Sequence, residues 1–282
     1  MTSPVPIDRT VAGIRGRTGA WQQDGLRVGL VPTMGALHRG HLALVETLRA
    51  TADRVVVSIF VNPTQFAPGE DFAAYPRDEA ADLALLASAG VNAVFAPAVD
   101  AMYPDGFATT VTVGGPADGL ESDFRPHFFA GVATVVAKLL LSCVPDVAIF
   151  GEKDYQQLAV IQRMVADLTI PTAIAGHPTV READGLALSS RNAYLSPEER
   201  KIAPGLHAVL NEAAMGIRGQ NEPMEVLLGA RRALADLGFK VDYVEARNAE
   251  TLAPVVEYGK EPIRLLAAAR LGKTRLVDNI GV

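Results

Sequence analysis

The chain lacks several features that whole classes of protein require. It has one cysteine and five histidines in 282 residues. No disulfide can form within such a chain, which favours a reducing cytoplasm as its location. The cysteine, Cys143, follows the apolar residues 139–141, so we expect a buried small side chain at this position.

Long apolar runs and an excess of positive charge are also missing. The longest apolar stretch, residues 132–144, is interrupted by Lys138 and is too short to span a bilayer. The first ten residues, MTSPVPIDRT, contain no apolar core, so no secretory signal peptide is expected. The net charge of −6 at pH 7 argues against nucleic-acid binding, which needs a basic face. It does not argue against a nucleotide ligand, because a few local cations can neutralise the phosphates.

The remaining composition is that of a globular protein, with 49% hydrophobic and 21% charged residues. Strand-like and helix-like segments alternate through the first two-thirds of the chain. We expect strands at 26–31, 54–61, 91–96, 107–114, 146–150 and 172–175. We expect helices at 42–48, 78–89, 131–143 and 154–167. Such alternation predicts parallel strands with helical crossovers, which bind ligands at the carboxyl ends of the strands.

The pattern changes near residue 180. Helices are expected at 197–217 and 223–237, followed by strands at 240–246, 263–269 and 274–277. Helices followed by strands indicate a small α+β domain. We therefore predict an α/β protein with a Rossmann-like parallel-sheet domain, residues 1–179, and a smaller C-terminal α+β domain, residues 180–282. Because no Gly/Ser-rich linker separates them, we expect the two domains to meet closely at a cleft.

The most informative motif is VPTMGALHRGH at residues 31–41. It places His38 and His41 where a strand gives way to a helix, so both rings can face a ligand at the helix N-terminus. This pattern predicts a nucleotide phosphate site. Two alternatives are an incidental histidine pair and a zinc site, although no other His, Cys or carboxylate group has zinc-ligand spacing.

Three further segments follow predicted strands or the domain boundary. NPTQF at 62–66 offers amides for a carboxylate or hydroxyl, or forms a capped turn. FGEKDYQQ at 150–157 places Lys153 in a first helical turn, where an anionic ligand would explain it better than a solvated helix start. VREADGLALSSRN at 180–192 ends in two hydroxyls and a guanidinium that suit phosphate, or it is a polar linker.

Taken together, residues 26–194 resemble the pantothenate synthetase family, within the superfamily of nucleotidyltransferases and class I aminoacyl-tRNA synthetases. The resemblance implies an ATP-dependent ligase that joins pantoate to β-alanine. The reaction would pass through pantoyl adenylate and release AMP and pyrophosphate. Implied partners are pantoate, β-alanine, ATP and Mg²⁺, in a homodimer formed through the N-terminal domain.

The resemblance also assigns roles to individual positions. It implies four catalytic side chains: His38, His41, Lys153 and Arg191. It implies seven nucleotide-binding positions: Met34, Gly40, Gly151, Asp154, Val180, Ser189 and Ser190. It implies four pantoate-binding side chains: Asn62, Gln65, Gln157 and Tyr75, the last of which would line the entrance to the site. We expect the 189–192 loop and the C-terminal domain to close over the intermediate as a lid.

The chain departs from the family pattern at three points. Thr64 replaces the usual Met of N-P-M-Q-F. His127 stands one place early in the R-P-G-H-F pattern, and Phe128 takes its position, so we expect His127 to be structural. Only Asp82 remains where the family has two adjacent acids near the metal. Asp82 is therefore a candidate Mg²⁺ ligand, although phosphate oxygens and water could hold most of the ion.

Two other functions share part of these features. A nucleotidyltransferase that keeps the nucleotide on its product would fit the histidine motif alone. A non-catalytic nucleotide-binding protein would bind ATP without forming pyrophosphate. The amides of Asn62, Gln65 and Gln157 favour a small polar acid as substrate, and therefore the ligase.

Overall fold

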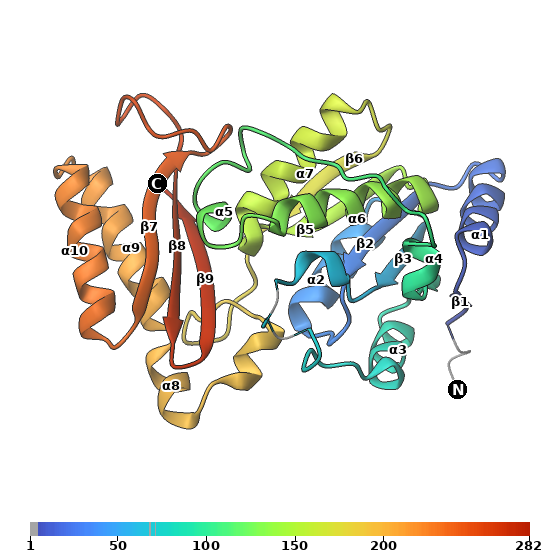
Figure 1. Cartoon of the computed structure of the whole chain (residues 1–282), viewed down its shortest axis with the longest axis horizontal. Helices are drawn as coiled ribbons and strands as arrows, with labels where there is room; N and C mark the ends of the chain where they lie inside the picture. Colours follow the sequence, from blue (N-terminus) through green and yellow to red (C-terminus); the bar gives the residue numbers. More distant parts are fainter. Residues whose placement is uncertain (1–4, 68, 71) are drawn as a thin grey trace. The chain divides into compact units, whose positions relative to one another are not determined.

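A six-stranded parallel sheet, ordered β1-β4-β3-β2-β5-β6, forms the first of two units in the computed structural model (Figure 1). The structure describes residues 5–67, 69–70 and 72–282. The first unit spans Met1–Val113, Arg125–Glu152 and Val160–Pro178. Its strands are β1 (Ile7–Asp8), β2 (Val28–Thr33), β3 (Arg54–Ile59), β4 (Ala93–Phe95), β5 (Val147–Gly151) and β6 (Ala173–His177). The predicted Rossmann-like α/β fold is confirmed.

Helices connect these strands in the manner that the alternating pattern predicts. They are α1 (Val11–Gln23), α2 (Arg39–Arg49), α3 (Glu79–Ser88), α4 (Val99–Met102), α6 (Phe128–Cys143) and α7 (Tyr155–Asp167), with the 3-10 turn η1 (Pro63–Gln65). Helix α2 leads from β2 to β3, and α7 leads from β5 to β6. Strand β2 lies between β3 and β5, so the strand order reverses there, and ligands of such sheets collect at the carboxyl ends beside that point.

Apolar side chains on the strands explain why the sheet is buried. Val31, Val57 and Val94 pack in one core cluster with Leu48 of α2 and Leu86 of α3. All five are at most 1% exposed. Burying each contributes roughly 1.5–3 kcal/mol relative to leaving it in water. The core therefore fixes α2 and α3 against the sheet, and both helices carry predicted site residues at their first turns.

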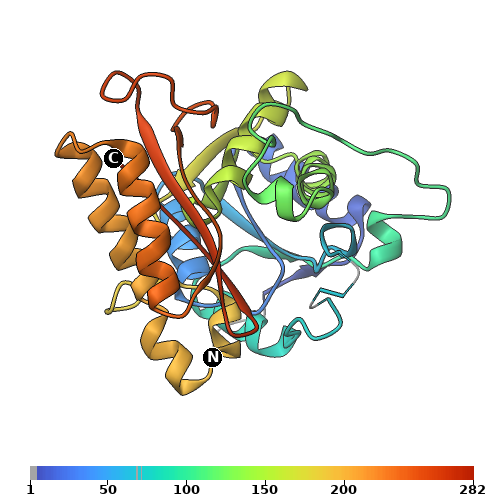
Figure 2. The ribbon, with the colours of Figure 1, turned by 60° about the vertical axis from the view of Figure 1, so that its left-hand side comes forward.

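The second unit spans Gly114–Phe124, Lys153–Ala159 and Thr179–Val282. Its antiparallel sheet is β7 (Lys240–Asn248), β8 (Ile263–Leu271) and β9 (Thr274–Gly281), in that order. Helices α9 (Gly205–Arg218) and α10 (Pro223–Asp236) lie along this sheet in Figures 1 and 2. The unit also contains α5 (Glu121–Phe124), α8 (Pro197–Ile202) and the 3-10 turn η3 (Ser190–Tyr194). The predicted smaller α+β fold is confirmed.

A buried guanidinium joins an early segment to the sheet of the second unit. Arg275 on β9 donates through Nη1 to both oxygens of Glu121, at 2.7 Å, and through Nε to Asp242, at 2.7 Å. Gln156 holds the same early segment, because its Oε1 accepts from the Glu121 backbone and its Nε2 donates to the carbonyls of Pro116 and Gly119. Buried polar groups of this kind are stable only when paired, and here the pairing unites segments distant in the sequence.

One predicted strand is wrong and one predicted helix is divided. Residues 107–114 form no strand, although their alternating β-branched pattern predicts one. The amide of Val111 donates to the Thr134 hydroxyl on α6, at 2.9 Å, instead of to a neighbouring strand. The helix expected at 197–217 is interrupted at Pro204, which lacks an N–H donor and stands as the N-cap of α9.

The first two elements were not predicted. Strand β1 has two residues and pairs with β4 only through the fold. Helix α1 contains three glycines, which weaken its intrinsic helix propensity. It is capped by Thr10, whose side chain accepts from the Gly13 amide, and it packs against α6. Among the described residues, no helix is both long and apolar enough to cross a membrane.

Close contact between α6 and η1 leads to a first prediction. A Cβ added at Gly131 would lie 2.7 Å from the Thr64 carbonyl carbon and 2.9 Å from the Gln65 nitrogen. We expect Gly131→Ala to push η1 away and to lower the free energy of unfolding by about 1–3 kcal/mol, measured by urea denaturation.

The matched control is Gly16→Ala in α1, where an added Cβ meets no atom within 4 Å. Alanine should raise the stability there by about 0.5–1 kcal/mol, because it favours the helix. Equal effects of the two substitutions would contradict the prediction.

Candidate functional site

The histidine motif forms the start of α2. His38 is the N-cap residue, and its Nδ1 accepts a hydrogen bond from the Gly40 amide at 3.1 Å. The Nδ1 of His41 accepts from the His38 amide at 3.2 Å, so the two side chains form a reciprocal capping box. Their ring centroids are 4.1 Å apart. The prediction that the histidine pair lies where a strand is followed by a helix is confirmed, because β2 ends at Thr33 and α2 begins at Arg39.

This arrangement determines which nitrogen carries the proton. In a neutral imidazole one nitrogen donates and the other accepts. Because Nδ1 accepts a backbone N–H in both His38 and His41, the proton of each neutral ring lies on Nε2. Both rings are therefore hydrogen-bond donors through Nε2, beside a helix N-terminus whose dipole favours anions.

The loop that leads to these histidines is held by Asp82 of α3. Gly35 and Ala36 both have left-handed backbone conformations, with φ of 81° and 52°. Such a conformation is costly for alanine and needs support from its surroundings. Asp82 provides it: Oδ2 accepts from the Ala36 amide at 3.0 Å and Oδ1 from the Leu37 amide at 2.8 Å.

The position of Asp82 bears on the candidate metal site. Its side chain is buried, and burial raises the pKa of the carboxyl, while the two backbone hydrogen bonds lower it. Both oxygens are engaged by the loop. Within the part of the chain that the structure describes, no group of three or more His, Cys, Asp or Glu residues could hold a metal ion. Because both carboxylate oxygens of Asp82 accept loop amides, the geometry favours loop support over metal coordination for this residue.

A hydrogen-bonded chain joins predicted pantoate residues to the predicted nucleotide loop. The Asn62 amide donates to Gln65 Oε1 at 3.1 Å, and Gln65 Nε2 donates to the Met34 sulfur at 3.1 Å. Three of the residues expected in the site, from two separate motifs, therefore lie side by side. This chain sets the orientation of the Gln65 amide, with its oxygen toward Asn62.

The Asn62 side chain is 1% exposed, and protein groups engage both of its ends. Its Oδ1 accepts from the Tyr103 hydroxyl at 2.8 Å and from the Thr64 hydroxyl at 3.0 Å. Its Nδ2 also donates to the Gly131 carbonyl at 3.2 Å. The Thr64 hydroxyl thus contributes a bond that a methionine could not make. This arrangement favours Asn62 as the residue that positions Gln65.

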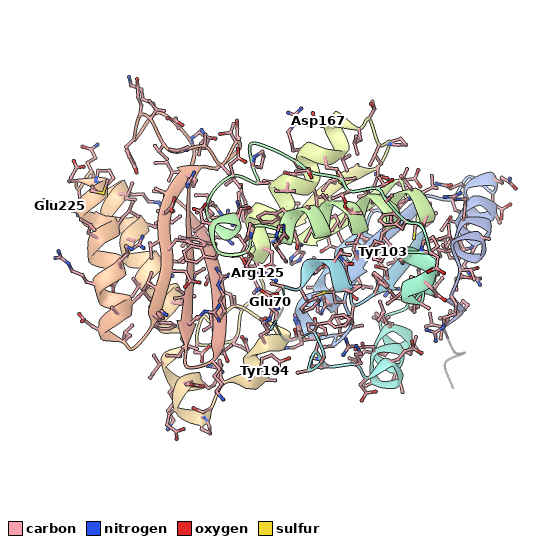
Figure 3. All side chains as sticks on the ribbon, in the orientation of Figure 1. Glu70, Tyr103, Arg125, Asp167, Tyr194 and Glu225 are labelled. Carbon is pink, nitrogen blue, oxygen red and sulfur yellow. The ribbon has the colours of Figure 1, made fainter. Side chains whose placement is uncertain are left out.

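Arg125 holds the backbone of the same turn. Its guanidinium donates to both carboxylate oxygens of Glu70, at 2.7 and 2.6 Å, and to the Gln65 carbonyl at 3.0 Å. Figure 3 labels Arg125 and Glu70 next to each other, and Tyr103 beyond them. The Arg125 guanidinium also lies 4.0 Å from the Phe128 ring centroid. Phe128, which takes the family's histidine position, therefore stacks on the arginine.

Other expected residues of the first unit lie as follows. Tyr75 is 6% exposed, and its ring packs edge-on against Phe66. His127 is exposed at the start of α6 and makes no side-chain cap. Gly151 ends β5, and an added Cβ would meet no atom within 4 Å. Open space beside Gly151 is compatible with close approach of a ligand.

The GEKDYQQ motif separates into supporting and accessible residues, and its residues 153–157 belong to the second unit. Lys153 and Asp154 lie in the 3-10 turn η2 (Glu152–Asp154), with Lys153 Nζ 3.4 Å from Asp154 Oδ1. Gln156 is buried and holds residues 116–121, whereas Gln157 is half-buried. The second glutamine is thus the one with accessible surface, as its expected ligand role requires.

The segment that begins at Val180 folds back on itself. The Leu188 amide donates to the Val180 carbonyl at 2.9 Å, and Arg181 pairs with Ala187 in an isolated β-bridge. Ser189 then caps η3 by accepting from the Arg191 amide at 3.3 Å. The structure therefore places the predicted phosphate clamp in one ordered turn, with Ser189, Ser190 and Arg191 consecutive and partly exposed.

The sequence pattern did not identify the residues that hold these groups. Tyr103, Arg125 and the pair Asp278–Asn279 make their contacts only in the folded chain. The sequence carried a signal for Arg125, because this residue belongs to the Arg-Pro-His segment that includes His127. No comparable pattern marked the last strand, although Asp278 pairs with Arg181 there, at 2.6 Å.

The chain is similar to known protein sequences and to solved structures over nearly its whole length. The sequence model described as Pantoate-beta-alanine ligase matches residues 7–281. A protein named pantothenate synthetase from Paramagnetospirillum magneticum is 59% identical over 283 residues, covering 100% of this chain and 99% of the relative. One from Rhodospirillum rubrum is 56% identical, covering 99% of each.

Two solved structures are also similar over nearly the whole chain. Pantothenate synthetase from Thermus thermophilus has a TM-score of 0.90 and 49% identity, covering 98% of this chain and 99% of that one. Pantoate-beta-alanine ligase from Francisella tularensis, complexed with beta-gamma ATP and beta-alanine, has a TM-score of 0.83 and 33% identity, covering 98% and 97%.

The Asp82 contacts lead to a prediction about stability. Asp82→Ala would leave the Ala36 and Leu37 amides without their acceptors, which should lower the free energy of unfolding by about 1–3 kcal/mol in urea denaturation. Glu79→Ala, in the same helical turn, is the control. It breaks only an exposed ion pair with Arg9, which should cost about 0–1 kcal/mol. A smaller loss for Asp82 than for Glu79 would contradict the proposed loop support.

Proposed function

Because the chain belongs to the pantoate-beta-alanine ligase family, it is an enzyme that joins pantoate to β-alanine, and we propose which residues serve each step. ATP drives the reaction. The pantoate carboxylate attacks the α-phosphorus of ATP, and the bond to pyrophosphate breaks. The β-alanine amine then attacks the acyl carbon of pantoyl adenylate, AMP leaves, and the amine gives up a proton to solvent. One observation carries this proposal: His38 and His41 stand at the start of α2 in a chain that matches the family over residues 7–281.

The first step is an electrostatic problem more than a proton-transfer problem. A carboxylate is already ionised at pH 7 and needs no general base. It must instead approach a polyanion, which like charges resist. We propose that His38 and His41 donate through Nε2 to phosphate oxygens as negative charge shifts onto pyrophosphate. The N-terminus of α2 adds a partial positive charge in the same place.

The first unit would also bind pantoate. Gln65 is proposed to contact pantoate directly, with its amide oriented by Asn62 and Met34. Asn62 is proposed to act mainly through Gln65, because both N–H groups of its amide are donated to protein acceptors, whereas Gln65 donates one of its two to Met34. Tyr75 supports the turn through Phe66. Gln157 in the second unit is proposed as a further hydrogen-bond donor to pantoate. The side chain of its neighbour Gln156 is instead hydrogen-bonded to the backbone of residues 116–121.

The second unit would bind the phosphates and sugar of ATP. Lys153 is proposed to contact phosphate, Asp154 the ribose hydroxyls, and the backbone at Val180 the adenine. Ser189, Ser190 and Arg191 are proposed to bind the β- and γ-phosphates, because short hydroxyls and a planar guanidinium match phosphate geometry. Backbone at Met34, Gly40 and Gly151 would approach the nucleotide in the first unit. The ATP and β-alanine bound to the Francisella relative support these ligand classes.

Mg²⁺ is proposed to enter as the MgATP complex rather than to occupy a resident protein site. The observation behind this is that Asp82 uses both carboxylate oxygens on the loop. Mg²⁺ keeps several waters and commonly binds through substrate phosphates. When bound, it neutralises part of the phosphate charge.

We propose two further properties, the oligomeric state and the location of the protein. The family resemblance supports a homodimer. The single, buried cysteine supports a cytoplasmic location, because it provides no internal disulfide. Sedimentation velocity tests the first proposal: a monomer at micromolar concentration would exclude it.

The decisive experiment follows pyrophosphate release with MgATP while pantoate and β-alanine are added singly and together. Mass spectrometry identifies the products. We expect sustained release only when both acids are present, with AMP and pantothenate formed in equal amounts. A product that retains the nucleotide, or release without pantoate, would overturn the proposed reaction.

The histidine assignment predicts a defect confined to adenylation. His38→Ala and His41→Ala should each slow pantoyl adenylate formation at least about tenfold, a barrier change of roughly 1.4 kcal/mol. Single-turnover measurement with pantoate and ATP checks this. His127→Ala is the matched control and should stay close to the wild-type rate. Unchanged rates in either of the first two variants would refute their role.

The MgATP proposal predicts the metal dependence of Asp82→Ala. Its turnover should fall, because the loop before His38 loses support, while the Mg²⁺ concentration for half-maximal rate stays unchanged. A titration of Mg²⁺ at fixed ATP measures this. A shift of about tenfold or more in that concentration would instead make Asp82 a metal ligand.

A further inference from the structure

Two adjacent residues of the last strand contact both nucleotide-binding segments of the second unit. Asp278 and Asn279 lie on β9, and the two residues are buried, with 4% and 3% of their surface exposed. Asp278 contacts Arg181, 97 positions earlier. Asn279 contacts Lys153, 126 positions earlier. These are the segments to which the proposed function assigns the phosphates of ATP.

The contact of Asn279 sets the backbone of the Lys153 turn. Its Nδ2 donates to the Lys153 carbonyl at 2.8 Å. Its Oδ1 accepts from Arg264 Nε at 2.7 Å, which fixes the direction of the amide. Arg264 in turn lies 4.1 Å from the Tyr155 ring centroid, and the Tyr155 hydroxyl donates to the Ala249 carbonyl. The turn that carries Lys153 is thus tied to the sheet on both sides of Asp154.

The contact of Asp278 sets the start of the other segment. Arg181 donates to Asp278 through two nitrogens, at 2.6 and 2.8 Å, and to the Gly185 carbonyl at 3.1 Å. Asp278 also accepts from the Asn279 amide at 2.7 Å. A two-pronged ion pair of this kind defines an orientation as well as a distance. It therefore anchors the turn from which Ser189 and Arg191 follow.

Neighbouring residues on a strand direct their side chains to opposite faces of the sheet. A single short piece of β9 can therefore reach two loops that the sequence separates. We propose that Asp278 and Asn279 are positioning residues that set the spacing between Lys153 and the Ser189–Arg191 turn for the phosphates of ATP. This inference rests on the proposed function of those two segments.

Binding of α,β-methylene-ATP with Mg²⁺, measured by calorimetry on the full chain, tests the inference. Asn279→Ala and Asp278→Asn should each weaken binding by about tenfold, while the KM for pantoate stays near the wild-type value. Asn279→Asp keeps the acceptor for Arg264 but removes the donor to Lys153. It should weaken ATP binding as much as the alanine variant does.

A control separates positioning from a loss of stability. Leu276 lies on the same strand and is buried in the core of the second unit. Leu276→Ala should lower the melting temperature at least as much as Asn279→Ala, yet leave the affinity for the analogue unchanged. An equal loss of affinity in the two variants would overturn the inference, because general destabilisation would then explain it.

A double-mutant cycle tests whether Asn279 acts through Lys153. In a Lys153→Met background, Asn279→Ala should change the affinity by no more than about twofold. Wild-type affinity in Asn279→Ala together with weak binding in Lys153→Met would overturn this inference but leave the phosphate role of Lys153 intact. Wild-type affinity in Lys153→Met would overturn the phosphate role of Lys153, and with it the inference.

Discussion

Pairing between buried side chains and loop backbone is the interaction on which the rest of the proposed site depends. Asp82 accepts two amides of the loop before His38, Asn62 engages the turn that carries Gln65, and Asn279 donates to the carbonyl of Lys153. A buried donor or acceptor left without a partner costs about 1–3 kcal/mol. Each loop is therefore held in the conformation that satisfies these groups, and ligand-facing side chains take their positions from it.

Hydrogen bonding to loop backbone also determines the chemical character of the two histidines. The histidine rings cap α2 through Nδ1, so their neutral forms present Nε2–H donors rather than bases. Donors arranged before the reaction stabilise developing phosphate charge without a cost of reorganisation. A ligase whose nucleophile is already a carboxylate needs that property more than it needs proton transfer. Local helix capping and the proposed electrostatic role of this pair thus share one hydrogen-bonding arrangement.

The sequence was most informative where a pattern is local. Apolar periodicity located most of the strands and helices, because the burial of one face repeats every two or about 3.6 residues. It failed at residues 107–114, which form no strand although they are rich in β-branched residues, and where the Val111 amide donates to the Thr134 hydroxyl instead. It also missed α1, whose three glycines weaken the pattern while packing against α6 keeps the helix.

By itself the sequence determined the α/β class, the family and the motifs that carry the candidate site residues, because each depends on residues close together in the chain. Tertiary structure alone decided that Tyr103 and Arg125 hold the Asn62–Gln65 turn, and that Asp278 and Asn279 contact Arg181 and Lys153. These contacts join residues up to 126 positions apart. The free energy of a buried hydrogen bond depends on which groups the fold brings together, and no local spacing encodes that.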